Sequence, residues 1–158
     1  MIVKEIRDED FTSYKKPSMV IGFPSCTFKC EREYGQKICQ NSTLATAPDI
    51  EISIENIVDR YLQNPITKAI IFGGLEPMDS WCDMVNLIDG FRKHTEDEIV
   101  IYTGYKMDEI CKKTYWLGNK YKNIIFKIGR FIPNQQPRYD EILGINLASN
   151  NQYAEVIS

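Results

Sequence analysis

Residues 68–77 read KAIIFGGLEP, an apolar run that stops at two glycines. Four consecutive apolar residues between a lysine and a Gly-Gly pair are typical of a buried β-strand. Helical patterns flank this stretch on both sides. Ser53 is expected to cap a helix whose apolar residues recur at i, i+3, i+4, i+7 and i+8 until Pro65, and a second helix is expected from near Asp79. The stretch therefore predicts a strand between two helices.

The same alternation of strands and helices runs along most of the chain. Further strands are expected at residues 18–23, 98–102, 123–128 and 153–157, and a third helix from Met107 to about Trp116. Such alternation predicts βαβ units and a parallel sheet. We expect one α/β domain over residues 1–158, with ligands bound by loops that follow the strand ends.

The composition is ordinary for a globular domain, with 43% hydrophobic and 26% charged residues. No apolar run approaches the roughly 20 residues that a membrane helix needs. The first ten residues, MIVKEIRDED, are acidic where a secretory signal needs an apolar core. We therefore expect a cytoplasmic protein that does not bind membranes. The net charge of −3 gives no overall attraction to nucleic acid, and no nucleic-acid partner is expected.

Three of the five cysteines, Cys26, Cys30 and Cys39, are spaced C-x3-C-x8-C within residues 24–50, which lack periodicity and are expected to form a long functional loop. In a reducing compartment, metal ligation and simple burial are the two explanations for them. Three thiolates are one too few for a closed four-ligand site, whereas a four-iron cluster held by three cysteines keeps one iron open. The single histidine, His94, lies far downstream and is a poor fourth ligand.

The long gap before Cys39 is compatible with metal binding. Closing it costs roughly 1 kcal/mol more than closing a short gap, and metal–thiolate binding is worth on the order of ten times that. A zinc site with an unseen fourth ligand, or buried cysteines without metal, remain alternatives at this point. The other two cysteines, Cys82 and Cys111, lie in predicted helices, where we expect them to pack in the core.

Residues 73–77, Gly-Gly-Leu-Glu-Pro, follow the predicted strand directly. Two glycines let the backbone approach a ligand closely, and a buried Glu76 carboxylate there can accept hydrogen bonds from an ammonium group. Pro77 stiffens the exit of the turn. By itself this is an ordinary strand-to-loop turn, but it follows a cysteine triad.

Together, the triad and this turn resemble the radical S-adenosylmethionine enzymes. In that superfamily three cysteines hold a [4Fe–4S] cluster, S-adenosylmethionine chelates the fourth iron, and a Gly-Gly-Glu-Pro turn binds the methionine ammonium. Four further motifs, in order along nearly the whole chain, make it similar to the small activating proteins of anaerobic ribonucleotide reductase. They are Cys39-Gln40-Asn41, Tyr102-Thr103-Gly104-Tyr105, Gly129-Arg130-Phe131-Ile132 and Ser149-Asn150-Asn151-Gln152.

The resemblance implies a parallel sheet of βα units that forms a partial, open barrel of the radical S-adenosylmethionine type. It also implies a reaction: S-adenosylmethionine is cleaved reductively, and the 5′-deoxyadenosyl radical takes a hydrogen atom from a glycine of the partner. The implied partners are an anaerobic (class III) ribonucleotide reductase or another glycyl-radical protein, and an electron donor such as flavodoxin or ferredoxin. No residue is expected to act as a general base, because hydrogen-atom transfer depends on proximity.

The implied site residues form two groups. The cluster ligands are Cys26, Cys30 and Cys39. The residues that bind S-adenosylmethionine are Gly73, Gly74, Glu76 and Pro77 at the methionine end, Thr103 and Ile38 near the ribose and adenine, and Asn41 beside the third cysteine.

The chain departs from the family pattern in four places. The family usually has C-x3-C-x2-C, so about six extra residues precede Cys39. Leu75 interrupts the usual Gly-Gly-Glu-Pro, Ile38 replaces a frequent aromatic, and Ile128-Gly129-Arg130-Phe131 stands where Asp-Gly-Pro-Phe is common. Two alternatives therefore stay open: a radical S-adenosylmethionine enzyme that acts on another protein, a peptide or a small molecule, and a non-catalytic metal-binding module.

Overall fold

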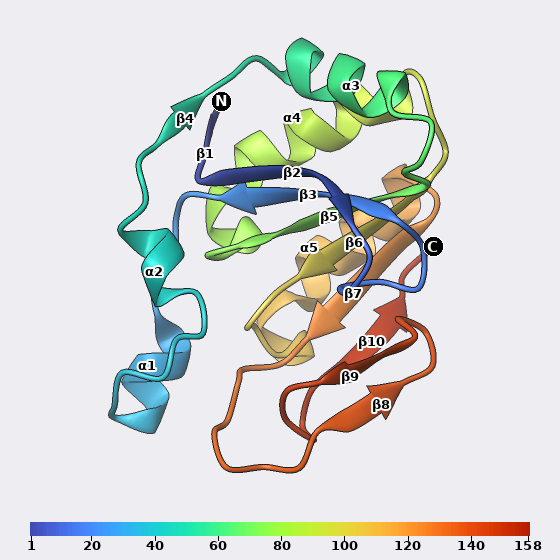
Figure 1. Cartoon of the computed structure of the whole chain (residues 1–158). Helices are drawn as coiled ribbons and strands as arrows, with labels where there is room; N and C mark the ends of the chain where they lie inside the picture. Colours follow the sequence, from blue (N-terminus) through green and yellow to red (C-terminus); the bar gives the residue numbers. More distant parts are fainter.

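A six-stranded mixed sheet organises the chain, and the computed structural model describes all residues from 1 to 158 (Figure 1). Its strand order is β10-β7-β6-β5-β3-β2. The four central strands are parallel, and the two edge strands are antiparallel to their neighbours. The strands of this sheet are β2 (Glu5–Asp10), β3 (Ser18–Phe23), β5 (Ala69–Gly74), β6 (Glu98–Tyr102), β7 (Ile124–Ile128) and β10 (Tyr153–Val156).

Two small sheets and six helical segments complete the fold. The small sheets pair β1 (Ile2–Val3) with β4 (Ile50–Glu51), and β8 (Arg138–Asp140) with β9 (Ile145–Leu147). The helices are α1 (Lys29–Tyr34), α2 (Ser42–Ala45), α3 (Ile54–Gln63), the 3-10 helix η1 (Pro77–Ser80), α4 (Trp81–Arg92) and α5 (Met107–Lys120). None of them is both long enough and apolar enough to cross a membrane.

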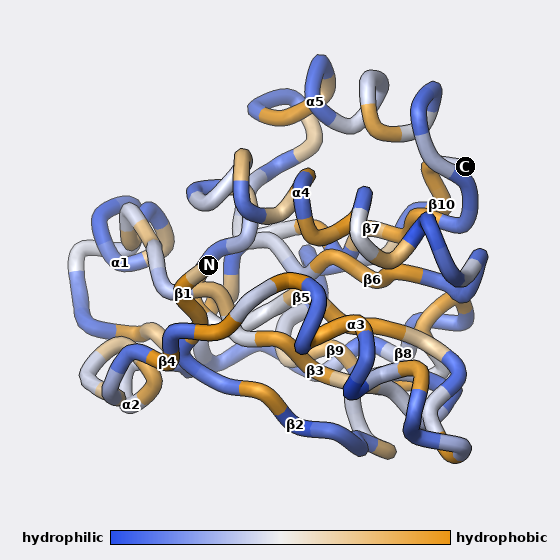
Figure 2. The backbone as a smooth tube through the Cα atoms, turned by 90° about the horizontal axis from the view of Figure 1, so that it is seen from above, coloured by the Kyte–Doolittle hydropathy of each residue, from blue (hydrophilic) through white to orange (hydrophobic).

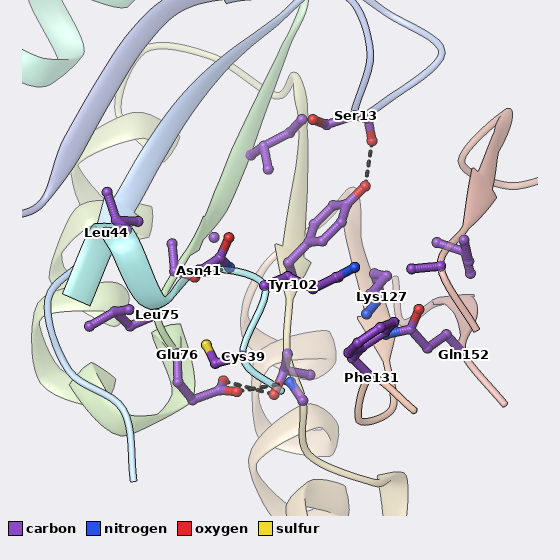
Figure 3. Close-up of a pocket in the computed structure, with 18 of the residues that line it drawn as sticks. Ser13, Cys39, Asn41, Leu44, Leu75, Glu76, Tyr102, Lys127, Phe131 and Gln152 are labelled. Atoms are coloured by element: carbon purple, nitrogen blue, oxygen red, sulfur yellow. Dashed lines mark hydrogen bonds between the residues drawn. The ribbon is translucent and has the colours of Figure 1, made fainter. Parts of the chain in front are cut away.

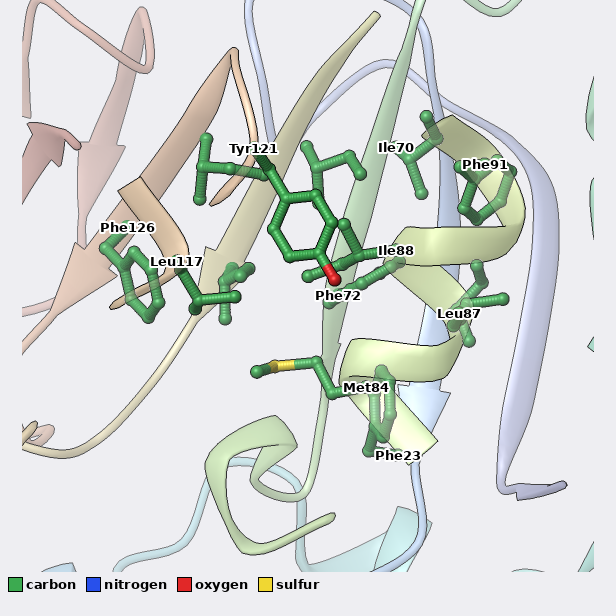
Figure 4. Close-up of a cluster of buried hydrophobic side chains, with 14 of the residues drawn as sticks. Phe23, Ile70, Phe72, Met84, Leu87, Ile88, Phe91, Leu117, Tyr121 and Phe126 are labelled. Atoms are coloured by element: carbon green, nitrogen blue, oxygen red, sulfur yellow. The ribbon is translucent and has the colours of Figure 1, made fainter. Parts of the chain in front are cut away.

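The three longer helices, α3, α4 and α5, pack on one face of the sheet and form the main core with it. Figure 4 shows Phe72 of β5 beside Ile88 of α4, and Phe126 of β7 beside Leu117 of α5, within this core. The tube in Figure 2 is most hydrophobic along the central strands and hydrophilic on the outer turns of the helices. A second, smaller core lies on the opposite face, where Val20, Ile71 and Leu147 are buried. The segment around Tyr14 and the β8–β9 hairpin cover that face.

The predicted strands are confirmed to within two residues at their ends, and both β3 and β6 have the predicted bounds. The Ser53 cap is confirmed, because its hydroxyl accepts a hydrogen bond from the Asn56 backbone N–H at 3.1 Å. Residues 24–50 are not one loop, since they contain α1, α2 and β4. The sheet is mixed at its edges, and the partial barrel that the resemblance implies stays a prediction.

The expectation that Cys82 and Cys111 pack in the core is wrong, because both are exposed. Helix α4 turns Met84, Leu87 and Ile88 toward the sheet, which places Cys82 on the outer face. Helix α5 buries Ile110, Thr114 and Leu117, which leaves Cys111 off its buried face, and it continues beyond Trp116 to Lys120. Of the three residues that its apolar pattern places on the buried side, Ile110, Cys111 and Tyr115, only Ile110 is buried, and Tyr115 is 76% exposed.

The end of β5 approaches β3 so closely that only glycine fits there. Gly74 has φ +84°, and a Cβ atom on it would lie 2.6 Å from the Cα of Gly22. Gly73 is different, because a Cβ atom on it would meet nothing closer than the Tyr102 Cβ at 3.9 Å. The two adjacent glycines therefore have different roles: Gly74 allows the turn, and Gly73 leaves open space beside Tyr102.

This difference predicts that Gly74→Ala lowers the free energy of unfolding by about 2–4 kcal/mol, from left-handed backbone strain and overpacking. Gly73→Ala should change it by about 1 kcal/mol or less, because the site is spacious and alanine is not penalised there. Urea unfolding of the two variants beside the wild type measures both values. Equal destabilisation by the two substitutions would contradict the assignment.

Candidate functional site

A cavity of about 380 Å³ lies at the carboxyl ends of the parallel strands, on the face away from the long helices (Figure 3). This volume is in the range of small-ligand sites, and the position is where α/β sheets commonly bind ligands. Most residues expected from the sequence line this one cavity. They are Cys26, Cys30, Cys39, Asn41, Gly73, Gly74, Glu76 and Thr103. Ile38 and Pro77 do not line it: Ile38 is half-buried beside Cys39, and Pro77 is buried at the start of η1.

The three cysteines come from different parts of the segment that follows β3. Cys26 lies just after the strand, Cys30 is in the first turn of α1, and Cys39 follows the extra residues. Each thiol lines the cavity, but no three His, Cys, Asp or Glu side chains are grouped so that they could hold one metal ion. A four-iron cluster binds each thiolate at a different iron, so its three ligands need not meet at one point. Soft thiolate donors of this kind suit iron–sulfur clusters. The donor set therefore fits a [4Fe–4S] cluster better than a single zinc ion.

Burial disfavours the thiolate form of two of the three cysteines. Burial raises the pKa of Cys26 to about 12 and also raises the pKa of Cys39. The Phe28 backbone N–H, 3.2 Å from the Cys26 sulfur, opposes this shift only in part. Because metal ligands must be thiolates, cluster binding releases protons from these side chains.

Polar contacts attach the cysteine segment to the strand ends. The Asn41 side chain donates to the carbonyl of Gly74 at 2.7 Å. The Thr27 backbone N–H donates to Asp79 at 2.7 Å, and the Tyr105 hydroxyl donates to the other oxygen of the same carboxylate. These contacts join the first and third cysteines to the loops after β5 and β6.

Glu76 is 5% exposed and accepts three hydrogen bonds. Its Oε1 accepts from the Met78 backbone N–H at 3.1 Å and from the Thr103 hydroxyl at 2.8 Å, and its Oε2 accepts from the Gly104 backbone N–H at 2.8 Å. Burial nevertheless raises the pKa of Glu76 to about 7. The inserted Leu75 donates its backbone N–H to Phe23 at 3.2 Å, and Glu76 still lines the cavity.

A buried arginine clamps the extra residues of the cysteine segment. The Arg130 guanidinium, whose side chain is 5% exposed, forms two hydrogen bonds with Glu109 of α5, at 2.7 and 2.8 Å. It also pairs with Glu33 of α1 at 2.9 Å. Lys29, next to Cys30, reaches the same Glu109 at 3.0 Å and lies 4.5 Å from the Tyr105 ring centroid. The sequence contained Arg130 as part of a motif but gave no sign of this clamp, because its partners come from distant segments.

Lys127 and Tyr102 also line the cavity, although neither was expected there from the sequence. The available signal was a single charged residue inside the otherwise apolar strand NIIFKI. A lysine at such a position is unusual, because buried lysines are normally paired.

A family model described as "4Fe-4S single cluster domain" matches residues 18–152. The chain belongs to this family. The match covers the cysteine triad, the cavity and the strands that build it, so the protein is an iron–sulfur protein, compatible with an oxidoreductase. The zinc and metal-free alternatives are accordingly disfavoured. No curated protein and no solved structure matches the chain.

The Arg130 clamp predicts that Arg130→Lys releases a reconstituted cluster several-fold faster. Lysine keeps the charge but cannot make the two parallel bonds to Glu109. The measurement is the decay of the visible absorbance of the cluster in the presence of an iron chelator. Arg138→Lys is the matched control, because Arg138 is exposed in β8 and forms no ion pair. Equal decay in the wild type and both variants would show that the clamp does not hold the cysteines.

Glu76 predicts a pH dependence of stability. Its pKa in the fold lies above the value of 4.5 for a free side chain, so ionisation weakens the fold as pH rises from about 4.5 to about 7. The contribution is at most about 3 kcal/mol, since one pKa unit corresponds to about 1.4 kcal/mol. Glu76→Gln should therefore lose less stability between pH 4.5 and 7.5 than the wild type does. Urea unfolding at both values tests this, and an unchanged difference would contradict it.

Proposed function

We propose that this protein reductively cleaves S-adenosylmethionine and uses the resulting radical to generate a glycyl radical on an anaerobic ribonucleotide reductase. One observation carries the proposal: the three cysteines and the Glu76 carboxylate line the same cavity at the ends of the parallel strands. The order of motifs along the chain supports the same assignment.

The residues of the cavity have distinct roles in this proposal. The thiolates of Cys26, Cys30 and Cys39 would hold a [4Fe–4S] cluster, which leaves one iron without a protein ligand. When bound, the cluster supplies one electron to S-adenosylmethionine, whose bond between sulfur and the 5′ carbon breaks to give methionine and a 5′-deoxyadenosyl radical that takes a hydrogen atom from the partner's glycine. The chain's own contribution is to bind, orient and exclude water.

Glu76 is suited to accept a hydrogen bond from the methionine ammonium. A carboxylate has about four lone-pair positions, and three are already used by Met78, Thr103 and Gly104. These three donors fix the carboxylate, and one acceptor position remains for a ligand. Because the pKa of Glu76 is about 7, ammonium binding should strengthen as pH rises through neutrality.

Other cavity residues shape the space around the ligand. Gly73 leaves room beside Tyr102 for a close approach of the ligand to the backbone. Thr103 acts through Glu76 by its 2.8 Å hydrogen bond, which adds a positioning role to its expected place near the ribose. Asn41 holds the segment after Cys39 on the Gly-Gly turn. Val20, Ile71 and Leu147 give the cavity an apolar wall.

The proposed partners follow from the same resemblance. The radical is delivered to a class III ribonucleotide reductase or another glycyl-radical protein, and a flavodoxin or ferredoxin supplies the electron. We also propose a cytoplasmic location, where such donors operate. The proposed reaction transfers a hydrogen atom, so no residue needs to act as a general base.

Anaerobic reconstitution followed by EPR tests the proposal. Replacing Cys26, Cys30 or Cys39 by alanine should abolish the reduced-cluster signal, because two thiolates hold a cluster poorly. The exposed Cys82→Ala and Cys111→Ala are the matched controls and should keep it. Addition of S-adenosylmethionine should change the signal, and dithionite should then yield 5′-deoxyadenosine. A spectrum that S-adenosylmethionine leaves unchanged would favour a non-catalytic metal-binding module.

Mixing the reduced protein and S-adenosylmethionine with a candidate reductase separates the possible targets. A stable glycyl-radical EPR signal on the reductase is the expected result. Formation of 5′-deoxyadenosine without that signal would indicate that the radical acts on another protein, a peptide or a small molecule.

A further inference from the structure

The extra residues between Cys30 and Cys39 fold back around one side chain, that of Glu31. Helix α1 ends at Gly35, whose φ of +78° turns the chain and whose backbone N–H donates to the carbonyl of Glu31 at 2.8 Å. Beyond this turn, the Cys39 backbone N–H donates to the Oε1 atom of Glu31 at 3.1 Å. Because Glu31 directly follows Cys30, the contact joins the third cysteine of the triad to the neighbour of the second.

This hydrogen bond compensates for the length of the insertion. A long gap between two ligands raises the entropic cost of closing the loop when both bind one cluster. The contact between Glu31 and Cys39 closes the same loop before any cluster is bound, and a hydrogen bond to an ionised acceptor is stronger than one between neutral groups. Apolar packing does not fix the loop, since α1 has no buried residue. Glu31 is therefore suited to position Cys39.

The two glutamates of α1 differ in their electrostatic surroundings. Glu33 pairs with Arg130 at 2.9 Å and with Lys106 at 3.5 Å, so cations balance its charge. Glu31 is half-buried, accepts the Cys39 N–H and forms no ion pair within 4.0 Å. The charge of Glu31 therefore stays unbalanced beside a cysteine of the triad.

A negative charge at this place acts on electron transfer as well as on binding. Burial is the main reason why the pKa of Cys39 is raised, and the negative charges of Cys30 and Glu31 add to it, so the Glu31 carboxylate is close enough to act on the sulfur. The reduction potential of an iron–sulfur cluster depends on its net charge and on its surroundings. Because reduction adds a negative charge, an anion beside a ligand disfavours the reduced state and lowers the potential.

We propose that Glu31 is a positioning residue with two effects: it holds Cys39 in place for cluster binding, and its unbalanced charge lowers the reduction potential of the cluster. The inference depends on the iron–sulfur family assignment. It deepens the proposed function and rests on it for its consequence alone, because a lower potential makes the reduced cluster a stronger electron donor to S-adenosylmethionine. The potential and the stability of the cluster are both measured without that ligand.

Two variants of the reconstituted full chain separate these effects. Glu31→Gln removes the charge, but its amide oxygen still accepts the Cys39 N–H. A potentiometric titration followed by EPR should show the reduction equilibrium of Glu31→Gln shifted about three- to tenfold toward the reduced state, which is about 30 to 60 mV for a one-electron couple. Release of its cluster to an iron chelator should stay within about twofold of the wild type. Glu31→Ala loses both charge and contact, so its potential should rise similarly and its cluster should be released several-fold faster.

Glu55→Gln is the matched control, because it also removes one glutamate charge. Glu55 is exposed in the first turn of α3, and Figure 1 shows α3 well apart from α1. This variant should change neither the potential nor the release rate. A rise in potential equal to that of Glu31→Gln would show that net charge alone sets the effect, and it would overturn the inference.

Three further results would contradict the role of Glu31. An unchanged potential in Glu31→Gln overturns the inference even if its cluster is released faster, because the carboxylate then has a structural role alone. A Glu31→Gln protein that takes up no cluster overturns it as well, since the amide keeps the hydrogen-bond acceptor. Release from Glu31→Ala at the wild-type rate would show that the contact does not hold Cys39.

The same measurements keep the inference apart from the proposed function. If the potential of Glu31→Gln rises as expected and S-adenosylmethionine leaves the EPR spectrum of the wild type unchanged, the inference stands and the proposed function is wrong. If S-adenosylmethionine changes that spectrum and Glu31→Gln has the wild-type potential, the inference is wrong and the proposed function stands. A wild type that takes up no iron overturns both.

Discussion

The site depends on one buried carboxylate. Glu76 follows the Gly-Gly turn after β5, yet its oxygens are held by the Thr103 hydroxyl and the Gly104 backbone N–H at the end of β6. This connection fixes the loops of two adjacent strands relative to each other. The contact is possible because Gly74 allows β5 to end against β3 and the chain to turn back across the strand ends. Without the contacts of Glu76, the loops after β5 and β6 would not form a fixed edge of the cavity.

The cysteine segment is held in a different way from the sheet. None of the residues in α1 and α2 is fully buried, so the segment gains little from apolar packing. Its position comes from directed polar contacts: Arg130 and Lys29 with Glu109, Thr27 with Asp79, and Asn41 with Gly74. Such contacts are weaker than a core but specific in geometry. A metal cluster would add the binding energy that the segment lacks on its own.

Two charged side chains of the cavity, Glu76 and Lys127, have no ionic partner in the protein. A lysine and a glutamate without ionic partners weaken an empty protein, and proteins tolerate this where a ligand completes the pairing. The apolar surroundings of Ile71 and Leu147 strengthen each electrostatic contact inside the cavity.

The sequence by itself determined the order of β3, β5, β6, β7, β10 and the three longer helices, because apolar periodicity and glycine stops are local properties. It missed the edge strand β2 and the short elements β1, β4, β8, β9, α1 and α2, which have no such pattern. The resemblance to the radical S-adenosylmethionine enzymes also grouped the three cysteines, Glu76 and Thr103, and these residues line one cavity at the strand ends. Only the tertiary structure decided that Cys82 and Cys111 are exposed, which depends on how α4 and α5 rotate against the sheet. Only the structure, again, revealed the Arg130 clamp and the unpaired Lys127. Whether a charge is paired depends on distances between segments that are far apart in the chain, and a linear pattern does not contain those distances.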